Sequence, residues 1–184
     1  MKKYEFTGET KQVELSFRTV TLHRIKAVAE FGIVKVGDLG GWIEKEENLS
    51  HEEKAWVCGD AWVCGDACIY DDAKVYDDAK VYGNAWVCGN AEVCGNAKVC
   101  GDAWVCGDAW VFSTSHVLVI GPIGSRNDFT TFFRDKDSEI TVKCGCFLGK
   151  IDKFIEKVCE THGDSKYAIV YRAAVEIAKQ QIDL

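Results

Sequence analysis

Small and branched aliphatic residues recur every six positions through the middle of the chain. Ten consecutive six-residue units run without a gap from Ala55 to about Thr114. The first residue of each unit is Ala, and the third is Val or, in one unit, Ile. Because alternate residues of a strand face the same side, the pattern predicts one short strand in each unit, with its Ala and its Val or Ile pointing inward.

The last two positions of these hexads favour residues that tolerate tight turns. In every unit but the last, Gly or Asp stands fifth and Asp or Asn sixth. Such residues adopt left-handed or turn conformations at low energetic cost. The hexads therefore predict a left-handed parallel β-helix in which three units make one triangular coil, so that ten units give slightly more than three coils.

The segments on either side lack the six-residue period and are expected to be separate domains. We predict a mainly β protein with an N-terminal β cap (1–48), the hexapeptide-repeat β-helix (49–114) and a small C-terminal ββαα domain (115–184). The best strand candidates of the cap are 4–6 and 22–28. Ile43 and Leu49 fall in the Ala frame of the hexads, which predicts an imperfect first coil before Ala55.

The C-terminal domain shows the patterns of a hairpin and two helices. Residues 129–134 and 139–147 are expected to pair, after a strand at 116–120. A helix over 151–162 has apolar residues at helical spacing and ends before Gly163. A second helix is capped by Asp164 or Ser165.

Composition and charge narrow the function classes. The net charge is −7, and no Lys and Arg cluster exists to neutralise phosphates or bind a membrane surface. The first residues lack the apolar run of a signal peptide, and no stretch approaches the length of a membrane span. We expect a cytoplasmic protein that binds neither membrane nor nucleic acid.

Most of the ten cysteines belong to the hexads. Reduced thiols are expected in the cytoplasm. Cys88 and Cys106 stand three hexads apart, so they should be neighbours on adjacent coils. Cys144 and Cys146 should share one face of a strand, but two ligands do not make a zinc site. The sequence therefore indicates no metal and no cofactor.

Sorting the hexads by threes assigns the outward residues to three faces. The third face is expected to be an interaction face because it is rich in Trp and Tyr and carries no charge; it comprises Cys68, Tyr70, Trp86, Cys88, Trp104 and Cys106. The first face comprises Trp56, Cys58, Lys74, Tyr76, Glu92, Cys94, Trp110 and Phe112. We expect the third face to be covered by a terminal domain, to form a homo-oligomer or to dock on another protein.

The whole chain resembles a group of hexapeptide-repeat proteins of bacteriophages and prophages, most of them of unknown function. Outside the hexads, the resemblance rests on five segments, at 22–27, 36–44, 48–50, 144–149 and 161–164. It implies a phage origin and a left-handed β-helix between an N-terminal cap and a C-terminal domain. It supplies no catalytic residues.

Three functional hypotheses follow. A hexapeptide-repeat acyltransferase using acetyl-CoA would need a histidine base, yet His23, His51, His116 and His162 all lie outside the regular hexads. An acidic DNA mimic would use the Asp residues of the corners, which corner geometry explains equally well. We favour a non-enzymatic binding or scaffold protein, an inhibitor of bacterial antiphage defence whose target is a host defence protein or a small signalling nucleotide.

Overall fold

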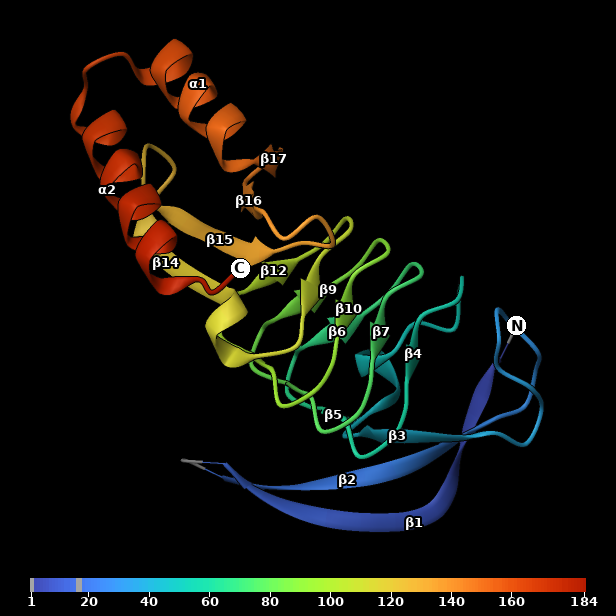
Figure 1. The fold of residues 1–184 in the computed structure, drawn as a ribbon. Helices are drawn as coiled ribbons and strands as arrows, with labels where there is room; N and C mark the ends of the chain where they lie inside the picture. Colours follow the sequence, from blue (N-terminus) through green and yellow to red (C-terminus); the bar gives the residue numbers. More distant parts are fainter. Residues whose placement is uncertain (1, 16–17) are drawn as a thin grey trace.

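Each hexad forms the strand and the corner that its sequence predicts. The computed structural model describes residues 2–15 and 18–184. Its solenoid (Figure 1) contains ten two-residue strands, which are β4 (Trp56–Val57), β5 (Trp62–Val63), β6 (Cys68–Ile69), β7 (Lys74–Val75), β8 (Lys80–Val81), β9 (Trp86–Val87), β10 (Glu92–Val93), β11 (Lys98–Val99), β12 (Trp104–Val105) and β13 (Trp110–Val111).

The strands stack in three parallel sheets, one for each face. Their orders are β13-β10-β7-β4 on the first face and β12-β9-β6 on the third. On the second face the order is β3-β5-β8-β11, in which β3 (Leu39–Ile43) precedes the hexads. Each of the first seven hexad strands pairs with the strand three hexads further on, so that Val57 lies beside Val75 and Val75 beside Val93. The prediction of a mainly β fold built on a parallel β-helix is confirmed.

The Ala and Val columns fill the interior of the solenoid. Every first-position Ala and every third-position Val or Ile of the hexads is at most 1% exposed. Burying such side chains is the main favourable contribution of the hexads to folding. The outward second and fourth positions are left free to differ from one coil to the next.

The corners require left-handed backbone conformations. Gly83 has φ +79° and stacks directly against Gly101 of the next coil, so that a Cβ built on Gly83 would lie 2.9 Å from the backbone N of Gly101. Where Asp replaces glycine, its side chain bonds the next coil: the Asp71 carboxylate, at φ 56°, accepts a hydrogen bond from the Gly89 N–H at 3.0 Å.

An imperfect first coil precedes the hexads, as expected, but its frame is different from the predicted one. Ile43, at the end of β3 (Leu39–Ile43), pairs with Val63, and Leu49 pairs with Ile69. Both therefore continue the Val columns, and their assignment to the Ala frame was wrong. The spacing from each to its partner is longer than three hexads by two positions, because residues 50–54 lengthen one corner.

The N-terminal cap is a long hairpin, formed by β1 (Tyr4–Leu15) and β2 (Arg18–Ala27). Strand β2 pairs with β3 and so extends the second sheet to six strands. The buried Tyr4 joins the main core and donates a hydrogen bond from its hydroxyl to the Leu49 carbonyl at 2.8 Å. Near the other end of the hairpin, Val20 and Leu22 pack with Trp42 and Trp62 in a second core, which covers part of the second face.

The C-terminal region contains the predicted antiparallel sheet and two helices. After the short 3-10 helix Thr114–His116, its elements are β14 (Val117–Ile123), β15 (Asp128–Arg134), β16 (Ile140–Cys144), β17 (Phe147–Lys150), α1 (Ile151–His162) and α2 (Lys166–Gln181). The sheet has four strands, in the order β14-β15-β16-β17. The predicted strand over 139–147 is divided in two, because Gly145, at φ 54°, and Cys146 form a tight turn between β16 and β17.

This sheet lies between the solenoid and the helices (Figure 1). Adjacent residues of β15 face opposite sides: Phe133 joins the solenoid core, and Phe132 joins the core under the helices. The sheet therefore caps the last coil with one face and carries α1 and α2 on the other.

Replacing Gly83 by Ala should destabilise the protein by about 2 to 4 kcal/mol, because a left-handed conformation and a backbone contact both oppose the new Cβ. Gly101 is the matched control, since it has φ 68° and open space around its Cβ position. Gly101→Ala should cost only about 1 kcal/mol. Urea unfolding of both variants measures the difference, and equal losses would contradict stacking contact at the corner.

Candidate functional site

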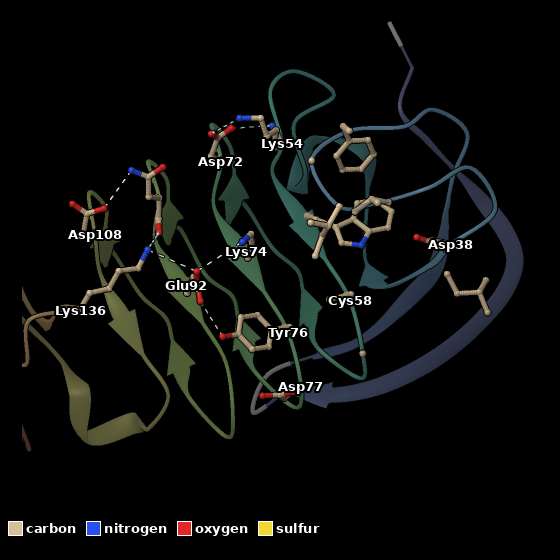
Figure 2. A pocket seen from close by; sticks show the side chains of 18 residues that line it. Asp38, Lys54, Cys58, Asp72, Lys74, Tyr76, Asp77, Glu92, Asp108 and Lys136 are labelled. Atoms are coloured by element: carbon tan, nitrogen blue, oxygen red, sulfur yellow. Dashed lines mark hydrogen bonds and ion pairs between the residues drawn. The ribbon is translucent and has the colours of Figure 1, made fainter.

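A groove of about 910 Å³ runs along the outer side of the first face (Figure 2). Its floor is formed by side chains in or directly after the stacked strands β4, β7 and β10, such as Cys58, Tyr76 and Glu92. The loop 31–34 of the N-terminal cap lines one end, and Lys136, from the turn between β15 and β16, lines the other. The groove thus combines residues from all three predicted domains.

The end of the groove near the cap is apolar. Trp56 is only 6% exposed because the Phe31 ring packs edge-on against it, with ring centroids 5.3 Å apart. Phe31 is held by a tight turn in which its backbone exchanges hydrogen bonds with Val34. Two apolar side chains of the rim remain in solvent, since Ile33 is 88% and Leu39 56% exposed.

The centre of the groove is charged and is organised around Glu92 (Figure 2). The Tyr76 hydroxyl donates a hydrogen bond to Glu92 Oε2 at 3.0 Å. The ammonium groups of Lys74 and Lys136 both lie 3.8 Å from Glu92 Oε1. Burial, followed by the neighbouring Cys94 and Glu92, raises the pKa of Tyr76, so its hydroxyl stays protonated and holds the carboxylate in place.

Side chains at and beside the corners along one edge of the groove form an ion pair and a hydrogen bond. Lys54 Nζ lies 3.1 Å from Asp72 Oδ2, and the Asn90 amide donates a hydrogen bond to Asp108 at 3.3 Å. In all, the lining has the carboxylates of Asp38, Asp72, Asp77, Glu92 and Asp108 and the ammonium groups of Lys54, Lys74 and Lys136. Five negative and three positive charges leave a formal charge of −2.

Sequence reasoning found only part of this groove. The six-residue period assigns Trp56, Lys74 and Glu92 to one face, and the sheet order confirms that assignment. Phe31 and Lys136 lie outside the hexads, and no periodic signal connects them to that face. The groove could not be predicted because its two ends come from non-repeating segments.

The six residues predicted as an interaction face do lie together on the third sheet. Cys88 and Cys106 are buried, Cys68, Tyr70 and Trp104 are partly buried, and Trp86 is 46% exposed. The rings cover one another, with centroids 5.8 Å apart for Tyr70 and Trp86 and 5.4 Å for Trp86 and Trp104. Lys143 of β16 lies 3.8 Å from the centroid of Trp104, which brings a charge to a face that has none in its own hexads.

The cysteines are free thiols. Cys88 and Cys106 are neighbours on adjacent coils, as expected, because they directly follow the paired strands β9 and β12. The Trp104 indole donates a hydrogen bond to Cys88 Sγ at 3.4 Å. A hydrogen bond from Cys106 lowers the pKa of Cys88, although burial opposes this shift.

The prediction that Cys144 and Cys146 share one face of a strand is wrong, since Cys146 lies in the turn after β16. Both cysteines line a second cavity of about 440 Å³ in the C-terminal domain, together with His162 and Tyr171.

None of the four histidines belongs to the lining of the groove over the first face, all of whose residues lie in the described part of the chain. His116 is 5% exposed and accepts a hydrogen bond from the Phe112 N–H at 3.3 Å. Its ring packs edge-on against Phe112 at 4.1 Å, and burial lowers its pKa. This histidine is therefore part of the junction between the solenoid and the C-terminal sheet.

One carboxylate cluster has the spacing of a metal site. Its members are Asp135, Asp137 and Glu139. The Lys150 ammonium lies among them, at 2.7, 3.0 and 2.6 Å respectively. Burial opposes ionisation of Asp135, but hydrogen bonds from Lys150 and Thr141 outweigh it and lower the pKa of this carboxyl. The cluster is accounted for as an ion-pair network that fixes the turn between β15 and β16.

No protein-family model matches the chain, and no curated protein matches it. Within residues 2–15 and 18–184, neither α1 nor α2 nor any other helix has the length and apolar character needed to cross a membrane.

Trp86 provides a test of the expected homo-oligomer. If copies associate through the third face, Trp86→Lys should reduce the mass in solution to that of a monomer, because a charge would be buried at the contact. Trp110→Lys is the control, since Trp110 occupies the same hexad position on the first face and is 37% exposed. Light scattering coupled to size exclusion measures the mass. An unchanged mass in a folded Trp86→Lys protein would exclude this surface as the oligomer contact.

Proposed function

We propose that the protein is a non-enzymatic binding protein that holds a partner protein in the groove over its first face. The observation that carries the proposal is the composition of the groove. The end near the N-terminal cap is apolar and has exposed side chains, and the centre is charged. The N-terminal region supplies one end of the groove and the C-terminal region the other. Apolar anchors next to a charged region are typical of protein interfaces.

The solenoid suits this role because its groove is preformed. The side chains of its floor project from strands whose inward residues are buried. The backbones of these strands are hydrogen-bonded from coil to coil, for example from Lys74 N to Ala91 O at 2.9 Å. A partner that binds such a surface loses its own conformational freedom but does not have to order the site.

The two alternative functions have less support. An acyltransferase would use a histidine base next to its acceptor, whereas the groove is lined by Lys, Asp, Glu, Tyr and apolar residues. A DNA mimic would need free carboxylates in regular rows, whereas Asp102 and Asp108 accept hydrogen bonds from Asn84 and Asn90 of the preceding coil. These bonds favour a structural role for the corner residues.

Cys58 and Cys100 give a matched pair for testing the groove. Both occupy the fourth hexad position and are partly buried, but Cys58 lines the groove and Cys100 belongs to the second face. The Cys58→Arg variant should no longer capture the partner, because a large charged side chain would occupy the groove above its floor. The Cys100→Arg variant should still capture the partner. Quantitative mass spectrometry of pull-downs from phage-infected cells measures both. A partner that both variants retain would contradict binding in the groove.

Inhibition of a bacterial defence component is the biological role that we propose for such binding, on the strength of the resemblance to phage proteins. Expression of the protein in a host that carries the relevant defence system should then restore plaques of a phage which that system blocks. The Cys58→Arg variant should fail to restore them. Unchanged plaque counts across hosts with varied defence systems would remove this role.

A further inference from the structure

Two lysines in the groove share a single carboxylate. Lys74 and Lys136 both face Glu92 Oε1 at 3.8 Å, which is beyond hydrogen-bond distance, and the Tyr76 hydroxyl occupies the other oxygen. Their side chains are 48% and 42% exposed. Lys136 also donates to the Asn90 carbonyl at 3.3 Å, whereas the Lys74 ammonium makes no hydrogen bond to the described residues. Two positive charges and one negative charge leave a local excess of +1.

The other carboxylates of the groove are already engaged. The Asp72 carboxylate pairs with Lys54, and that of Asp108 accepts from Asn90. Those of Asp38 and Asp77 accept backbone hydrogen bonds, at 2.8 Å from Lys35 N and 3.1 Å from Gly95 N. The centre of the groove therefore offers unused donors, while the acceptors along its rim are partly satisfied.

The apolar end lies close to this cationic centre. Trp56, Lys74 and Glu92 occupy successive strands of one sheet, and adjacent strands are about 4.8 Å apart. The distance from β4 to β10 is then about 10 Å, which an extended peptide covers in about three residues. Consecutive side chains of one short peptide can thus reach both places.

We infer, on the basis of the proposed function, that the groove binds an extended peptide segment with an acidic side chain near an apolar one. The apolar side chain packs at the end formed by Phe31, Trp56 and Leu39. The acidic side chain, about two to four residues away, accepts hydrogen bonds from Lys74 and Lys136. The overall charge of −2 in the lining disfavours a polyanion, whereas a single carboxylate placed between two lysines is compatible with it.

A random peptide library displayed against the full chain tests this inference. Selected peptides should be enriched in Asp or Glu about two to four positions from an aromatic or aliphatic residue.

The affinities of the selected peptides for four variants are then measured by fluorescence anisotropy with labelled synthetic copies. Lys74→Glu should weaken binding by about tenfold or more. Lys98→Glu, at the same hexad position on the second face, should leave it unchanged.

The Glu92→Gln substitution should change the affinity for acidic peptides in the opposite direction from Lys74→Glu. The amide oxygen of Gln still accepts the hydrogen bond from Tyr76, but the carboxylate that competes for the two lysines is gone. Binding of acidic peptides should tighten by about threefold or more. A purely structural role of Glu92 predicts no tightening, so this result separates ligand binding from a loss of folding.

The possible failures are distinguishable. In one outcome, the selected peptides lose binding to the Cys58→Arg variant but show no preference for acidic residues, and Lys74→Glu does not change their affinity. This outcome would overturn the acidic specificity and leave the proposed function in place. If the selected peptides bind the Cys58→Arg variant as tightly as the unmodified protein, their binding site lies outside the groove. That result would overturn the inference of a peptide groove. The proposed function would then depend on the pull-down alone.

Discussion

The constant register between coils is the constraint on which the rest of the structure depends. The backbone hydrogen bonds of the hexad strands run mainly from coil to coil, as from Trp56 N to Ala73 O at 3.0 Å and from Cys58 N to Val75 O at 2.9 Å. Because hexads pair with the third hexad before or after them, inward residues form columns of Ala and Val, and outward residues form faces whose members the sequence fixes. The corners stack closely in the same register, since a Cβ built on Gly83 would lie 2.9 Å from the backbone N of Gly101 in the next coil.

A stack of open coils needs protection at both ends, and here the protection also creates the site. Unpaired strands at the end of a solenoid invite pairing with other chains. Tyr4 and Ile25 close one end, and Phe133 closes the other. The segments that bring these residues into place also carry Phe31 and Lys136 to the two ends of the groove. Stability and binding thus share the same flanking elements.

Periodic segments could be predicted from sequence in detail, and non-periodic ones only in outline. The columns through Val57 and Val75 and the sorting of outward residues onto three faces follow from spacing alone. Ile43 and Leu49 were placed in the wrong frame because counting by six cannot detect a lengthened corner at 50–54. Cys144 and Cys146 were placed on one strand because alternation cannot distinguish a strand from the tight turn that Gly145 permits.

The three faces differ in how far other parts of the protein cover their outward side chains. The second face is partly covered by the hairpin, which leaves Trp42 and Trp62 each only 6% exposed. On the third face, the rings of Tyr70, Trp86 and Trp104 pack edge-on against one another, and Lys143 lies over Trp104, while Trp86 stays 46% exposed. On the first face the strands β7 and β10 keep Lys74, Tyr76 and Glu92 accessible between two walls. None of these three side chains contributes to the interior columns, so the fold does not require them there. The groove that we propose as the binding site is therefore built from side chains that the interior of the solenoid leaves free to vary.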